Sequence, residues 1–292
     1  MNSKNMKKSL NSKVKDWLKY IEDEKVKKAI QENLIITGGA LVSLLTGDEV
    51  HDYDCYFRTK EAAEIVAKYY VTKFNETHQD KPALLKFDEQ KSKFELYFDG
   101  VGRDVFEDET GEDTRDVIGF TEDEEVTENE IEKSKYRPVY LTNNAITLSD
   151  KVQIIIRFWG EAEEIHKNYD FAHCTCAWDM YTNELSLPQK ALECIINKEL
   201  FYIGSKYPLC SIIRTRKYIE RGYTINAGQY LKMCLQLNEL DLTNVEVLQD
   251  QLVGVDSAYF MKVIDYVKEK QSEDEKFKFD NNYLISIINK IF

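Results

Sequence analysis

Two aspartates stand at alternate positions in the stretch "HDYDCYF", which contains Asp52 and Asp54. The alternation and the aromatic residues predict a strand, so both carboxylates point to the same face of it. Two ionised carboxylates this close repel each other, and a pair of Mg²⁺ ions relieves the repulsion while forming a clamp for in-line phosphoryl or nucleotidyl transfer. Magnesium is expected because it binds through a few carboxylates together with substrate phosphates. We therefore predict that Asp52 and Asp54 are metal ligands and catalytic residues.

Two adjacent glycines precede this pair, in "LIITGGALVSLLTG". Gly38 and Gly39 separate a predicted strand at residues 34–37 from a short predicted helix, which Gly47 ends. A Gly-Gly turn that enters a helix lets the backbone approach a phosphate closely, and the first N–H groups of the helix point at the anion. Ser43 lies one helical turn further on. We predict that Gly38, Gly39 and Ser43 bind the triphosphate of a nucleotide, although a Gly-Gly turn taken alone is usually only a turn.

The composition is that of a chain that buries a sizeable core. With 292 residues and 43% apolar content, its length fits one large domain or two moderate ones, and two are expected. The sequence has neither an apolar run long enough for a membrane span nor a signal-peptide pattern, so we predict a cytoplasmic protein with no membrane partner. The six cysteines lack the spacing of a disulfide framework and are expected to be reduced thiols.

The negative charge is concentrated in one segment. Between Asp104 and Glu132 there are 14 acidic residues and one basic residue, Arg115, and the formal net charge of the whole chain is −13. The remainder is therefore close to neutral, and the total charge does not argue against a nucleic-acid partner. We predict that residues 104–132 are an acidic insert exposed to solvent, with a regulatory or strand-mimicking role as the alternative.

The hydrophobic periodicity predicts an α+β fold. Apolar residues at helical spacing indicate helices at residues 14–30 and 60–75. Alternating or β-rich stretches indicate strands at 34–37, 52–57, 137–144, 152–159 and 169–178, with a hairpin at 83–100. From about Leu187 the pattern is helical throughout, at 188–203, 208–222, 226–240, 244–254, 257–271 and 281–292. The predicted architecture is a mixed-sheet head domain at 1–186, followed by an all-helical domain at 187–292.

The first motif resembles that of a known superfamily. Gly38-Gly39, twelve intervening residues and then Asp52-x-Asp54 within an aromatic strand are similar to the signature of the polymerase-β-like nucleotidyltransferases. Within that superfamily the chain most resembles the tRNA CCA-adding enzymes and bacterial poly(A) polymerases. The resemblance implies a nucleotidyltransferase head domain, a helical neck and body, and Mg²⁺-dependent transfer of a nucleotide.

A second stretch, "KNYDFAHCTCAWD", resembles a later motif of those enzymes, which has the form Arg-Arg-Asp-Phe-Thr-Ile-Asn-Ala. Asp170 and Phe171 match it, and Asn168 and Tyr169 stand in place of the arginine pair. The resemblance implies a third carboxylate on a later strand. Asp170 is the predicted catalytic residue for that place, and Glu95 is the alternative.

A third stretch, "SIIRTRKYIERGYTI", resembles the helix that joins head to neck in those enzymes, with Arg214, Lys217 and Tyr218 at matching positions. Arg214, Lys217 and Arg221 share one helical face, which suits a triphosphate or an RNA backbone, or is simply a solvated face. We predict that Arg214 and Lys217 contact the nucleotide or the acceptor.

The predicted function is transfer of an NMP from an NTP to an acceptor, with an RNA 3′ end favoured, by a metal-dependent nucleotidyltransferase. The predicted partners are NTP and a tRNA-like RNA or a protein acceptor. Val42 and Ser43 stand where the related enzymes carry an arginine and an aspartate. Two alternatives therefore remain open, which are a binding protein that keeps the fold without the chemistry, and a toxin-type nucleotidyltransferase that modifies tRNA or protein.

Overall fold

The computed structural model describes residues 2–79, 82–89, 92–98, 135–142 and 144–244, and eight residues after 244 (247, 248, 251, 280, 282, 283, 285 and 286). The described residues form two compact units. Unit 1 comprises those up to residue 98, then 135–167 and 173–195, and unit 2 comprises 168–172 and those from 196 onward. The acidic insert predicted at 104–132 and the helix predicted at 257–271 lie outside the described residues, as do most of those predicted at 244–254 and 281–292. The predicted domain boundary between residues 186 and 187 stays a prediction.

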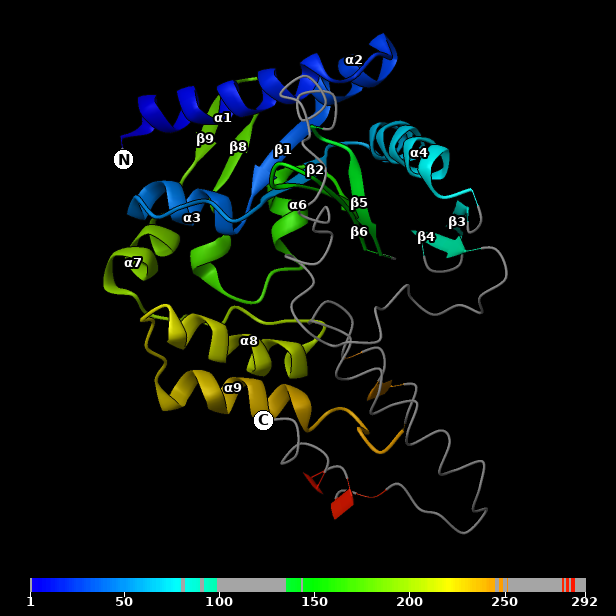
Figure 1. The fold of residues 1–292 in the computed structure, drawn as a ribbon. Helices are drawn as coiled ribbons and strands as arrows, with labels where there is room; N and C mark the ends of the chain where they lie inside the picture. Colours follow the sequence, from blue (N-terminus) through cyan, green and yellow to red (C-terminus); the bar gives the residue numbers. More distant parts are fainter. Residues whose placement is uncertain are drawn as a thin grey trace, which may run out of the picture. The chain divides into compact units, whose positions relative to one another are not determined.

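Unit 1 combines helices with a large sheet and a separate hairpin (Figure 1). The helices are α1 (Ser3–Lys19), α2 (Glu24–Asn33), α3 (Gly39–Thr46), α4 (Lys60–Thr77), α6 (Ala162–His166) and α7 (Gln189–Asn197), of which α7 continues into unit 2. The strands are β1 (Leu34–Thr37), β2 (Tyr53–Phe57), β3 (Ala83–Asp88), β4 (Lys93–Phe98), β5 (Pro138–Leu141), β6 (Ala145–Leu148), β7 (Val152–Trp159), β8 (Ala177–Asp179) and β9 (Glu184–Ser186).

The large sheet has seven strands in the order β5-β6-β7-β2-β1-β8-β9. Neighbouring strands pair antiparallel except β2 and β7, which are parallel, so the sheet is mixed. The three-residue turn between β6 and β7 runs from Ser149 to Lys151, and its last two residues, Asp150 and Lys151, have positive φ. Strands β3 and β4 form a second, two-stranded antiparallel sheet. Strand β2, which contains Asp54, thus lies in the middle of the large sheet, between β1 and β7.

The first helix forms because its apolar residues recur at three- and four-residue spacing. Met6, Leu10, Val14 and Trp17 are all buried on one side of α1. Asn2 caps the helix, since its side chain accepts a hydrogen bond from the Asn5 N–H at 2.9 Å. The Trp17 indole N–H donates to the Tyr70 hydroxyl at 2.6 Å, which ties α1 to α4.

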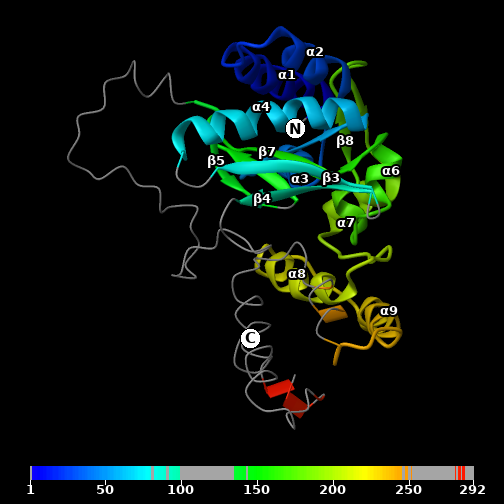
Figure 2. The ribbon, with the colours of Figure 1, turned by 90° about the vertical axis from the view of Figure 1, so that its right-hand side faces the viewer.

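The two faces of the large sheet differ in burial. Along β7 the burial alternates, with Val152, Ile154 and Ile156 buried and Gln153 and Ile155 only partly so. The buried face belongs to the same core as residues of α1, α2 and α4, and Figures 1 and 2 show these three helices on one side of the strands. The opposite face carries Asp54 and Gln153, because register partners on neighbouring strands point the same way. This second face is the partly open one.

Unit 2 is helical over the residues that the structure describes, with α8 (Pro208–Glu220) and α9 (Ala227–Leu237) as its long elements. A small aromatic core holds it together. The Phe171 ring is fully buried, with ring centroids 5.8 Å from Tyr202 and 5.5 Å from Tyr218. Asn226 caps α9 through a hydrogen bond from the Gln229 N–H at 3.2 Å. No helix among the described residues is both long and apolar enough to cross a lipid bilayer.

The predicted α+β class is confirmed, including the mixed sheet and the helical C-terminal region. The strand predicted at 169–178 is wrong for most of its length, because residues 172–174 form a 3₁₀ helix and only 177–179 are a strand. Residues 170–174 are all buried, so the stretch lacks the alternation that marks a strand. The short strands β6 and β9 were not predicted from the sequence.

Candidate functional site

The glycine turn and the aspartate pair lie at the same edge of the large sheet. Strands β1 and β2 are antiparallel, and Thr37, the last residue of β1, is the register partner of Asp54. Gly38 follows Thr37 directly, and Asp52 directly precedes β2. The end of β1, the start of α3 and the start of β2 therefore bring together the residues that the sequence analysis assigned to phosphate and to metal.

The two glycines of the turn have different reasons to be glycine. Gly38 has φ 81° and ψ −143°, a backbone conformation that residues with a side chain rarely adopt. Gly39 is the first residue of α3, and a Cβ added there would meet nothing within 4 Å. The fold therefore does not require glycine at position 39, whose backbone is exposed. An exposed helix N-terminus without a side chain is suited to close approach by an anion.

The backbone leading to the aspartates is held by the turn between β6 and β7. The Lys151 ammonium donates to the Val50 carbonyl at 3.0 Å and forms an ion pair with Glu49. The Tyr53 N–H donates to the Lys151 carbonyl at 2.8 Å. Asp52 lies between these two anchors and is exposed, and Asp54 is partly buried. The segment that carries both carboxylates is thereby fixed to the sheet.

Behind the turn, Thr37 is the centre of a buried hydrogen-bond network. Its hydroxyl donates to the Cys176 carbonyl at 2.8 Å and lies 2.8 Å from His166 Nε2. Because the hydroxyl has one proton and gives it to the carbonyl, His166 Nε2 must carry the proton that Thr37 accepts. Burial lowers the pKa of His166 to about 4, against a smaller opposing effect of Glu163. The imidazole is therefore neutral near pH 7.

The chemistry of the aspartate pair fits magnesium. Asp52 and Asp54 supply hard carboxylate oxygens at a partly open position, and Mg²⁺ commonly binds through one or two carboxylates with substrate phosphates completing the shell. Within the described part of the chain, no three or more His, Cys, Asp or Glu side chains are grouped so as to hold a metal ion. The two aspartates would hold a cation that a nucleotide's phosphates help to bind.

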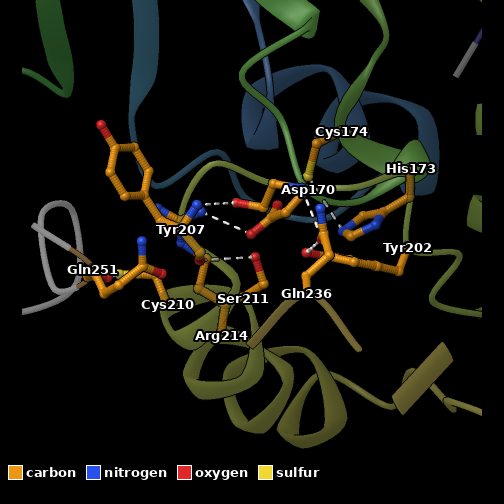
Figure 3. Close-up of polar contacts among 11 residues, drawn as sticks. Asp170, His173, Cys174, Tyr202, Tyr207, Cys210, Ser211, Arg214, Gln236 and Gln251 are labelled. Atoms are coloured by element: carbon orange, nitrogen blue, oxygen red, sulfur yellow. Dashed lines mark hydrogen bonds and ion pairs between the residues drawn. The ribbon is translucent and has the colours of Figure 1, made fainter. Parts of the chain in front are cut away.

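The structure places Asp170 and Arg214 together in unit 2, where Figure 3 shows them facing each other. Arg214 Nη1 lies 2.8 Å from Asp170 Oδ2, and the Asp170 side chain is 6% exposed. Burial lowers the pKa of the Arg214 guanidinium, but the charge and hydrogen bond of Asp170 outweigh it and the pKa lies above its ordinary value. Asp170 thus has a structural partner, and its catalytic role stays a prediction.

The other predicted site residues are dispersed. Ser43 is partly buried on α3, one turn after Gly39, in unit 1. Lys217 is exposed on α8 in unit 2. Glu95, the alternative third carboxylate, lies on β4 of the hairpin, where the Tyr97 hydroxyl donates to it at 2.5 Å and Lys93 lies 3.2 Å away. The assignments of Ser43, Lys217 and Arg214 to nucleotide contacts stay predictions.

Sequence reasoning missed the side chains that flank Asp54. Thr37 on β1 and Gln153 on β7 are its register partners, on either side. The signal for Gln153 is present in the sequence, as a polar residue near the start of the apolar stretch "VQIIIRFW". No local pattern marks Thr37 or its contact with His166, because that contact joins residues far apart in the chain.

The fold and the placement of the motif define a class of protein. A mixed sheet with a glycine turn between β1 and α3, and an Asp-x-Asp pair at the start of the neighbouring strand β2, is the nucleotidyltransferase fold that the resemblance predicted. Among solved structures, the chain is similar to the Thermotoga maritima CCA-adding enzyme complexed with tRNA, with 12% identity and a TM-score of 0.44, over 92% of this chain and 55% of that one. It is also similar to the Bacillus stearothermophilus CCA-adding enzyme in complex with CTP, with 12% identity and a TM-score of 0.39, over 82% and 48% of the two chains.

Within that class, the chain belongs to the Gabija anti-defense 2 family, whose model matches residues 8–198. A curated relative, Gabija anti-defense 2 of Bacillus phage SPbetaL7, is 24% identical over 259 residues. The match covers 88% of this chain and 48% of the relative, so the chain spans about half the length of that protein.

Proposed function

We propose that this chain is a Mg²⁺-dependent nucleotidyltransferase that moves an NMP from an NTP to an acceptor. The observation that carries the proposal is the pairing of Thr37 with Asp54, which puts the glycine turn and the carboxylates at one edge of the sheet. A triphosphate held at the N-terminus of α3 would have its phosphates beside a cation held by Asp52 and Asp54. In the in-line step an oxygen of the acceptor bonds to the α-phosphorus and pyrophosphate leaves, and a bound Mg²⁺ would supply charge stabilisation for this displacement.

The residues of unit 1 have separate tasks in this proposal. The backbone at Gly38 and Gly39 binds phosphate oxygens, with Ser43 as a further donor one turn along. Asp52 and Asp54 hold the cation and so neutralise the charge that develops on the phosphates in the transition state. The anchor from Lys151 to the Val50 carbonyl keeps the carboxylates in place while substrate enters.

The acceptor we favour is an RNA 3′ end. The structural relatives that have CCA-adding activity in their names include one complexed with tRNA. In unit 2, Arg214 and the exposed Lys217 lie on the same helix. We propose that both contact phosphates of the nucleotide or the RNA. Protein as acceptor, and tRNA modification of the toxin type, are alternatives that the same assay distinguishes.

The name of the curated relative supports a biological setting for this proposal. The curated relative is named as an anti-defense protein against Gabija. We propose that nucleotidyl transfer by this chain serves the same purpose, so that an enzyme activity rather than binding alone counters the defense. The competing function is a binding protein with the same fold, and the metal and nucleotide requirement separates the two.

The decisive test compares the wild-type chain with Asp54→Ala. Purified protein is incubated with each labelled NTP, Mg²⁺ and an extract of cells that carry Gabija, and the labelled product is then identified as RNA or protein. Asp54→Ala should reduce transfer by at least about 100-fold, because a main transition-state stabiliser is lost. It should also abolish protection of a phage in cells that carry Gabija.

Asn75→Ala serves as the control for that experiment. Asn75 lies on α4, where its side chain donates to the Ala83 carbonyl and accepts from the Ala83 N–H, and it has no role in the proposed chemistry. It should keep full transfer. A variant Asp54→Ala that transfers nucleotide as fast as wild type would disprove the proposal, and protection without any transfer would favour the binding protein.

A further inference from the structure

Gln153 occupies the position beside Asp54 on the open face of the sheet. Strands β2 and β7 are parallel neighbours, and Asp54 and Gln153 are register partners. Their side chains therefore point to the same face from strands about 4.8 Å apart. On the other side of Asp54 stands Thr37, whose hydroxyl is engaged with the Cys176 carbonyl and His166. Of these two neighbours, Gln153 is the one whose side-chain oxygen is available to bind a cation.

The orientation of the Gln153 amide follows from its hydrogen bond. Gln153 Nε2 donates to the hydroxyl of Thr147 at 3.4 Å, and Thr147 is the register partner of Gln153 on β6. In the sheet order, β6 lies on one side of β7 and β2 on the other. The nitrogen of the amide is thus used on the β6 side, and the oxygen is the atom that can serve a ligand on the β2 side, where Asp54 is the register partner.

The charges along this row of the sheet are few. From β8 to β6 the register partners on this face are Ala177, Thr37, Asp54, Gln153 and Thr147. Asp54 is the one ionised side chain among these five. An amide oxygen is a hard, neutral donor that binds Mg²⁺ or Mn²⁺ without adding the repulsion of a third carboxylate.

We propose that Gln153 supplies the third protein oxygen of the cation site formed with Asp52 and Asp54, either to the ion directly or to a water on it. This inference rests on the proposed function, since it concerns the same cation. It gives Gln153 the place for which the sequence suggested Asp170 or Glu95. A site with two carboxylates and one amide carries less negative charge than a site with three carboxylates. It therefore depends more on the phosphates of the nucleotide to hold its metal.

The test is cation binding by the full chain, with Mn²⁺ as the probe and no nucleotide present. Electron paramagnetic resonance counts the free Mn²⁺ at equilibrium with wild type, Gln153→Met, Gln153→Glu and Asp54→Ala. Gln153→Met keeps the length of the side chain and removes its oxygen, and should weaken Mn²⁺ binding about tenfold. Gln153→Glu adds a carboxylate, and should tighten binding by a similar factor. Asp54→Ala should lose the site.

The opposite signs of the two Gln153 variants distinguish a ligand from a merely structural residue. Unfolding in urea without cation checks that both variants keep the wild-type fold. If Gln153→Met binds Mn²⁺ as tightly as wild type, or if both variants weaken binding alike, the inference is overturned while the proposed function stands, provided that Asp54→Ala loses the site. If wild type binds no more Mn²⁺ than Asp54→Ala, the metal-dependent function fails as well. Gln189→Met is the matched control, because Gln189 is exposed on α7, where its side chain bonds Glu193; an effect there equal to that of Gln153→Met would also overturn the inference.

Discussion

Thr37 shows how one buried side chain can decide the state of another. Its hydroxyl has a single proton, which goes to the Cys176 carbonyl, so His166 must donate from Nε2. His166 is the C-terminal residue of α6, and its hydrogen bond supports Thr37, which directly precedes the glycine turn. A protonated imidazole could still donate this hydrogen bond, so the cost of protonation lies in burying a charge.

The pH dependence of stability follows from that burial. The pKa of His166 is lowered to about 4 in the folded chain, whereas an unfolded histidine titrates near pH ~6.5. The unfolded state therefore binds more protons between these values, and stability falls as the pH falls through this window. Between pH 7 and 4.5 the free energy of unfolding should therefore fall by about 2 kcal/mol more in wild type than in His166→Gln, whose side chain keeps a hydrogen-bond donor.

Urea unfolding of wild type and His166→Gln at the two pH values measures the difference, since other groups titrate equally in both chains. His78→Gln is the control, because that histidine is exposed at the end of α4. Equal losses in wild type and His166→Gln would contradict the prediction.

At the scale of the element, α3 has glycine at both ends for different physical reasons. Gly47 ends the helix with φ 87°, where the left-handed conformation favours glycine, and its N–H donates to the Ser43 carbonyl at 2.8 Å. Gly39 starts the helix with open space where a side chain would be. Gly47 therefore serves the fold, and Gly39 is the position at which we propose that phosphate approaches.

The two glycines give a matched pair of variants. Gly39→Ala should leave stability unchanged or raise it by about 0.5 kcal/mol, because alanine is the better helix residue, while raising KM for the NTP about tenfold. Gly47→Ala should lower stability by about 1 kcal/mol and leave KM unchanged. Urea unfolding and initial rates of transfer provide the measurements. Normal KM in Gly39→Ala would show that phosphate does not approach this end of α3.

Over the whole molecule, the sequence predicted what depends on local periodicity. The helical spacing predicted the buried residues in the C-terminal part of α1 and in α2, but not the break between these helices at residues 20–23. The strand β7 and the glycine turn before Asp52 and Asp54 were also predicted. Strands β6 and β9, of four and three residues, are too short to produce a pattern. The position of Gln153 beside Asp54 depends on the parallel pairing of distant strands, which no local pattern specifies.

The two units should respond separately to a change in the aromatic core of unit 2. Phe171→Ala removes a fully buried ring that packs against Tyr202 and Tyr218, which should cost about 3–4 kcal/mol within unit 2. Hydrogen exchange should then become faster in α8 and α9 and remain slow in α4. Ile36→Ala, in the core of unit 1, should have the reverse effect. Equal acceleration in α4 and α8 for both variants would show that the chain unfolds as one block.

The five residues 168–172 belong to unit 2, although the chain on both sides of them belongs to unit 1. The chain therefore passes between the units three times within the described residues: after 167, after 172 and after 195. A chimaera between two members of the family would need two grafts rather than one splice. Exchanging only the residues after 195 would leave Asp170 and Phe171 of one parent to meet the α8 of the other. A functional exchange of the helical unit should therefore carry this short segment with it.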